Sequence, residues 1–99
     1  MALPAIAAEP GLSATIARWD YDGKGDFATV LVVVDNKTAR TFEDTEWSCQ
    51  AISNGQPVGE ESFYIHNVQP NKQTSKSAVI RVVGHQQFDS AECRLLSSD

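Results

Sequence analysis

The feature that most constrains the fold is the regular alternation of short apolar segments with turn-forming residues. Segments rich in Val, Ile, Thr and aromatic residues recur roughly every ten residues, and clusters of Gly, Pro, Asn and Asp separate them. No window of about 11–18 residues sustains apolar residues at the helical spacing of i, i+3, i+4, i+7 and onward. Short strands at this spacing are typical of a β-sandwich or a barrel. The chain of 99 residues therefore predicts a single all-β domain.

The same pattern predicts six to seven antiparallel strands, of which six can be placed. Residues 26–34 are apolar on both alternating faces, so we expect a central strand that is covered at least in part on each side. The dipeptide Asn54-Gly55 predicts a type I′ hairpin turn, and Pro57 is expected to keep the next strand from starting before residue 58. The expected strands cover residues 12–21, 26–34, 43–53, 58–68, 74–83 and 90–96.

The two cysteines lie on different expected strands, and each is in phase with apolar neighbours. Cys49 shares its side of the strand with Trp47, and Cys93 shares its side with Leu95, because successive strand side chains alternate faces. We therefore predict a disulfide that bridges the core of the sandwich and stabilises it by roughly 4 kcal/mol. Two buried free thiols are the alternative. The wide spacing excludes a CxxC redox or zinc motif.

The N-terminal residues indicate export. Residues 1–8 end in the small-residue run Ala5-Ile6-Ala7-Ala8, which is similar to the end of a signal-peptide cleavage region. We expect a signal-peptide remnant, with Met1 added for expression, followed by one domain at residues 9–99. An ordinary disordered N-terminus is the alternative. Export agrees with a disulfide, and it predicts a periplasmic or secreted bacterial protein.

The charge of the chain limits the classes of partner. Thirteen acidic and eight basic residues give a net charge of −5, and the cations are scattered along the sequence. Nucleic acids and anionic membrane surfaces require a clustered positive patch, so neither is expected as a partner. A cationic partner is compatible with this charge. The longest apolar run, residues 30–34, is far shorter than the roughly 20 residues of a membrane span.

One acidic segment has some features of a calcium loop. Asp20, Asp22 and Asp26 surround two glycines, and alternating carboxylates are typical of such loops. With Asp20 as the first ligand, however, Lys24 takes the fifth position and Leu31 takes the twelfth, and neither can bind calcium. We therefore favour a hairpin turn with solvated acids, and we expect no metal ion and no cofactor.

Neither histidine has the neighbours of a catalytic or metal site. His66 and His85 show no fixed spacing to carboxylates or cysteines, and no nucleophile elbow marks any serine. We therefore expect no catalytic residues and no enzyme activity.

Aromatic side chains are candidates for an interaction surface. Trp47 is expected in the core, because it shares a face with Cys49, whereas Trp19 has no such assignment. Phe63 and Tyr64 are adjacent and point oppositely, so one is expected in the core and the other in solvent, with the register left open.

The middle of the chain resembles the FxLYD-type immunoglobulin-like modules of prokaryotic envelope proteins. The resemblance rests on residues 32–36 (VVVDN), the hairpin at residues 54–59 (NGQPVG) and the turn at residues 68–70 (VQP) before residues 78–82 (AVIRV). Asn71 stands where the pattern has Gly, and the Phe-x-Leu-Tyr-Asp segment that gives the family its name is missing. The resemblance implies an immunoglobulin-like β-sandwich in the cell envelope and implies no catalytic residues.

Together these features predict a non-catalytic exported binding or structural module, whose partner is another envelope protein. An accessory or inhibitor protein that docks on an envelope enzyme is one alternative, with strand addition to a sheet edge as the expected mode. A small-ligand or calcium-binding domain that uses Asp20, Asp22 and Asp26 is the other. The oligomeric state, the strand order and the binding residues are not determined by the sequence.

Overall fold

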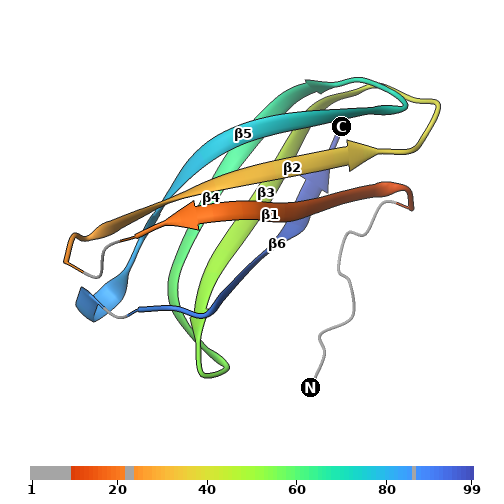
Figure 1. Cartoon of the computed structure of the whole chain (residues 1–99). Helices are drawn as coiled ribbons and strands as arrows, with labels where there is room; N and C mark the ends of the chain where they lie inside the picture. Colours follow the sequence, from red (N-terminus) through yellow and green to blue (C-terminus); the bar gives the residue numbers. More distant parts are fainter. Residues whose placement is uncertain (1–9, 22–23, 86) are drawn as a thin grey trace.

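Two three-stranded antiparallel sheets face each other in the computed structural model, which describes residues 10–21, 24–85 and 87–99 (Figure 1). The first sheet has the order β1-β2-β5 and the second has the order β4-β3-β6. The predicted all-β, sandwich-like fold is therefore confirmed. No helix among the described residues is long and apolar enough to cross a membrane. The elements are β1 (Leu12–Asp20), β2 (Phe27–Asn36), β3 (Phe42–Ser53), β4 (Gln56–Val68), β5 (Lys72–Arg81), a short 3-10 turn η1 (Val83–His85) and β6 (Ser90–Ser98).

All six placed strands are present, and their ends differ by a few residues at most. The expectation for Pro57 is wrong, because β4 begins at Gln56 and Pro57 pairs with Ile52. The register shifts between Ala51 and Ile52, which leaves Val58 as an extra residue opposite this step. Proline is tolerated there because β4 is an edge strand and the ladder is already interrupted by the bulge.

Two turns depend on residues that adopt positive φ. Asn54 (φ 50°) and Gly55 (φ 78°) form the tight connection between β3 and β4, as the type I′ prediction requires. In the turn before β5, Asn71 follows Pro70 and has φ 56°. A type II turn needs positive φ at this position, and asparagine tolerates it better than other non-glycine residues. Asn71 can therefore replace the glycine of the resembling pattern.

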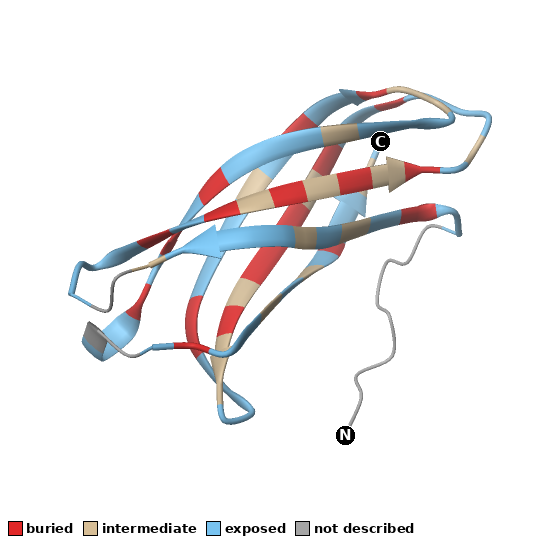
Figure 2. Ribbon diagram, viewed as in Figure 1, coloured by how far each residue is buried: buried red, intermediate tan, exposed pale blue. Residues whose placement is uncertain are grey.

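The core lies between the two sheets, and alternation along the central strands builds it (Figure 2). The outer side of β2 is covered in part, as predicted: Leu31 and Val33 are half-buried, whereas Phe27 is 60% exposed. β2 is thus a central strand with one dry face and one face that is only partly shielded. The fully buried residues of the two central strands include Ala28, Val30, Val32, Val34, Phe42, Trp47, Cys49 and Ala51.

Gly59 allows the edges of the two sheets to meet. It forms an isolated antiparallel bridge with Val82, and a Cβ atom built on Gly59 would lie 2.4 Å from the carbonyl oxygen of Arg81. No side chain fits at that distance. Glycine at this position therefore lets β4 approach the end of β5 closely.

A buried asparagine ties the end of β2 to the second sheet. The Nδ2 group of Asn36 donates to the carbonyl oxygens of Arg40 (2.9 Å) and Val68 (3.3 Å). Its Oδ1 atom accepts from the backbone N–H of Thr38 (2.9 Å). Because Asn36 is completely buried, these bonds satisfy groups that water cannot reach.

The disulfide forms between the predicted cysteines but does not join the two sheets. Cys49 on β3 lies directly opposite Cys93 on β6 in the same sheet, with Cα atoms 4.0 Å apart and a sequence separation of 44. The side-chain phase was correct: Cys49 is fully buried, and Cys93 packs against the core. Phase identifies the face of a strand but not its neighbour, so the prediction of a bond across the core is wrong.

Candidate functional site

A hollow of about 430 Å³ lies on the outer face of the second sheet. It is located where β3 begins and where β4 and β6 end. None of the described residues that line it is Lys or Arg. The lining residues are Asp44, Glu46, Tyr64, His66, Ser97, Ser98 and Asp99.

Strand register brings these side chains together. Asp44 pairs with His66, and Glu46 pairs with Tyr64 on one side and with Ser97 on the other. The residues between them, Thr45 and Ile65, are buried. Because side chains alternate along a strand, the polar and aromatic residues point outward from the same backbone that supports the core.

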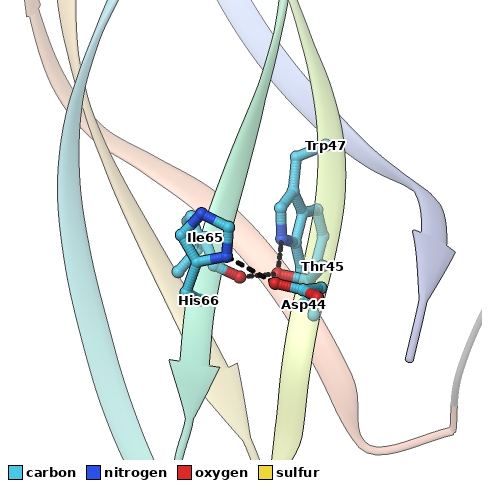
Figure 3. Close-up of polar contacts among 5 residues, drawn as sticks. All are labelled: Asp44, Thr45, Trp47, Ile65 and His66. Atoms are coloured by element: carbon cyan, nitrogen blue, oxygen red, sulfur yellow. Dashed lines mark hydrogen bonds and ion pairs between the residues drawn. The ribbon is translucent and has the colours of Figure 1, made fainter.

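A chain of buried hydrogen bonds fixes β3 against β4 behind the hollow (Figure 3). The indole Nε1–H of Trp47 donates to Thr45 Oγ1 at 2.8 Å, and Thr45 Oγ1 donates to the carbonyl oxygen of Ile65 at 2.8 Å. Each buried polar atom in this chain has a partner, which favours a single arrangement of the two strands. The hollow is therefore built on a rigid support.

Two parallel rings and a close acid–imidazole pair form one wall. His66 Nδ1 lies 2.5 Å from Asp44 Oδ1, and both side chains are more than half exposed. The Tyr64 and His66 rings are stacked, with centroids 6.1 Å apart and an interplanar angle of 2°. Together they place two parallel aromatic faces beside a carboxylate.

The opposite wall is held by backbone hydrogen bonds. The N–H of Asp99 donates to the carbonyl oxygen of Asp44, and the carbonyl oxygen of Asp99 accepts from the N–H of Glu43, each at 2.9 Å. These bonds place the Asp99 residue beside β3. The hollow thus combines the carboxylates of Asp44, Glu46 and Asp99 with an aromatic wall, which is a suitable environment for a cationic group.

The predicted weak metal candidates do not gather into a metal site in the described part of the chain. Asp20 ends β1 on the outer face of the first sheet, and Asp26 lies in the turn before β2, where its carbonyl oxygen accepts from the Val82 N–H at 2.7 Å. Asp22 lies outside the described residues. Among the residues that are described, no group of three or more His, Cys, Asp or Glu side chains is placed to hold a metal ion. His85 ends η1, and its side chain also lies outside the description.

The strand register shows which of the candidate aromatic side chains are buried and which are exposed. Trp47 is in the core as predicted, Phe63 is half-buried against it, and Tyr64 is 51% exposed. Trp19 packs against Phe88, with ring centroids 5.3 Å apart, near one end of the sandwich. Of these four candidates only Tyr64 belongs to the hollow.

Sequence reasoning missed the acids that line the hollow. The run from Glu43 to Glu46 contains three carboxylates and is the only local signal that could have drawn attention to this region. His66 lies on β4 and Asp99 directly follows β6, so the proximity of these partners depends on sheet order and register. Neither property can be derived from the periodicity of one segment.

Comparisons with protein families, with curated proteins and with solved structures found no match.

Proposed function

We propose that this domain is a non-catalytic exported binding module that docks on a basic segment of another envelope protein. The observation that carries the proposal is the hollow beside Tyr64 and His66, which gathers three carboxylates and neither Lys nor Arg among its described lining residues. Carboxylates beside aromatic faces favour a positively charged side chain.

Arginine fits this hollow better than lysine. A guanidinium group is planar, stacks on aromatic rings and offers two parallel N–H donors to a carboxylate. The parallel rings of Tyr64 and His66 supply the stacking surface, and Glu46 lies directly opposite Tyr64 in the β3–β4 pairing. The protein already contains one such contact elsewhere, since the Arg40 guanidinium carbon lies 4.4 Å from the centroid of the Phe42 ring.

The edge strands of both sheets are poorly suited to strand addition, which favours binding through a sheet face. Regular pairing with a new strand is hindered at each edge by a bulge or by charged residues. Register shifts leave Ala17 as an extra residue on β1 and Leu96 as an extra residue on β6, and β4 carries Pro57. The remaining edge strand, β5, carries Lys72 and Lys76.

We also propose that the sandwich is immunoglobulin-like. The sheet orders β1-β2-β5 and β4-β3-β6 correspond to strands A-B-E and C′-C-F of that fold, and Trp47 then lies on strand C. The motifs that resemble FxLYD-type modules have physical reasons in this structure: the buried hydrogen bonds of Asn36, the close strand approach at Gly59 and the positive φ of Asn71. These reasons support the family proposal. The disulfide supports export.

An accessory or inhibitor protein that docks on an envelope enzyme is a special case of the same proposal. The hollow would then receive a basic residue of the enzyme. The calcium alternative has weaker support, because Asp20 and Asp26 belong to no cluster that could hold a metal among the described residues. A ligand that binds only the native state raises the melting temperature. If added calcium leaves the melting temperature of this protein unchanged, that result would count against the calcium alternative.

Calorimetric titration with an N-acetylated Gly-Arg-Gly amide tests the arginine proposal. The matched probe replaces arginine with citrulline, which keeps the planar shape but has no charge. We expect millimolar affinity for the arginine peptide and roughly tenfold weaker binding of the citrulline peptide.

Two variants locate the site. Glu46→Gln is expected to weaken arginine binding about threefold or more. Glu60→Gln removes an acid from the same strand pair but outside the hollow, where Glu60 accepts from Gln50 Nε2 at 2.9 Å, and it is expected to have no effect. Equal binding of the two peptides, or equal effects of the two variants, would contradict the proposal.

A further inference from the structure

We propose that two copies of this chain associate through the outer face of the first sheet, β1-β2-β5. This inference is independent of the arginine-binding hollow, which lies on the other sheet. It rests on an exposed apolar stripe, on the charge balance of the face and on a second hollow in it.

The stripe follows the outward positions of β2 and continues onto β5. Phe27 is 60% exposed and Val79 is 48% exposed. Leu31 and Val33, which lie farther along β2, are half-buried. Ser75 and Ser77 of β5 pair with Val33 and Leu31. These small neighbours leave the stripe accessible to a flat partner surface.

The charges on this face favour a second copy over a strongly charged partner. The outward positions of its three strands hold two arginines, Arg18 and Arg81, and two aspartates, Asp20 and Asp35. The face is therefore balanced, although the whole chain has a net charge of −5. Self-association through this face avoids the repulsion that the acidic second sheet would produce.

A two-fold axis parallel to β2 makes the face complementary to itself. This operation places β5 of one copy over β1 of the other, because β2 lies between them in the sheet. Val79 then faces a hollow of about 460 Å³ that is lined by Arg18, Asp20 and Thr29 among others.

The same axis pairs opposite charges. Asp20 and Val79 both pair with Thr29, so they belong to the same cross-strand row, and Arg81 is one outward position beyond Val79. Arg81 of one copy therefore approaches Asp20 of the other, and the reverse contact forms as well.

Sedimentation velocity over a range of protein concentrations tests the association. We expect the apparent mass to rise from 10.8 kDa toward twice that value as concentration increases. Val79→Asp is expected to weaken association at least about tenfold, because it places a carboxylate against the Asp20 carboxylate of the other copy. A wild-type protein that stays at 10.8 kDa over the whole range would overturn the proposal.

Charge reversal tests the geometry. Arg81→Asp and Asp20→Arg are each expected to weaken association, and the double variant is expected to recover most of it. Arg94→Asp makes the same charge change on the second sheet and serves as the matched control, with near-ultraviolet circular dichroism confirming that each variant folds. Equal effects of Arg81→Asp and Arg94→Asp, or no recovery in the double variant, would overturn the proposed face and axis.

Discussion

The two outer faces of this sandwich have the same alternation of inward and outward residues, but their outward side chains differ in chemistry. On the first sheet the outward positions present an apolar stripe and balanced charges. On the second sheet they present the hollow and an excess of acids, which include Asp44, Glu46, Glu60 and Glu92 beside Arg94. The inward positions of both sheets are similar, because they share one core. The inward residues therefore specify this fold, whereas the outward residues are free to differ in function.

The sheets also differ in covalent support, and removing that support should have the largest effect. The Cys49→Ala/Cys93→Ala double variant is expected to lose about 4 kcal/mol of unfolding free energy, since the bond closes a long loop in the unfolded chain. Urea unfolding measures the loss. The wild-type protein in reductant should behave like the double variant, and a loss below about 1 kcal/mol in both would contradict this role.

Gly59→Ala tests the place where the two sheets meet. The new Cβ atom would collide with the Arg81 carbonyl oxygen, so the edges of β4 and β5 must separate. We expect a loss of about 3 kcal/mol in urea unfolding. Gly55→Ala has open space around its Cβ and only the strain of positive φ, so it should cost about 1 kcal/mol. Equal losses would show that the close approach at Gly59 is unimportant.

Thr45→Val should damage the support of the second face specifically. The substitution keeps the side-chain shape but removes the acceptor of the Trp47 indole and the donor to the Ile65 carbonyl. Leaving these buried groups without partners is expected to cost about 2 kcal/mol. The matched control Thr29→Val lies on the exposed face of the first sheet, and at low protein concentration it should change stability by less than about 0.5 kcal/mol. Similar values for the two variants would contradict the buried chain.

The smallest expected effect concerns the exposed stripe. Val79→Thr keeps the β-branched shape in a position that is nearly half exposed, so the unfolding free energy at low protein concentration should change by less than about 0.5 kcal/mol. A loss above about 1.5 kcal/mol would show that Val79 supports the fold rather than an outer surface.

Local patterns predicted the strands and their faces, because alternation and turn residues act over a few positions. Residues 26–34, Asn54-Gly55 and the phase of Cys49 are examples. The neighbours of each strand depend on sheet order, which is a long-range property. For that reason the sequence predicted a disulfide across the core, whereas the bond joins the neighbouring strands β3 and β6 of one sheet. For the same reason the sequence did not indicate that Asp44 would lie beside His66.

If the two faces have separate tasks, an NMR titration of the ¹⁵N-labelled protein with arginine amide should affect only one of them. We expect chemical-shift changes concentrated at Asp44, Glu46, Tyr64, His66 and the Ser97–Asp99 segment, with little change along the outward positions of β1, β2 and β5. Equal changes on both faces, or changes confined to the first sheet, would contradict this separation of tasks.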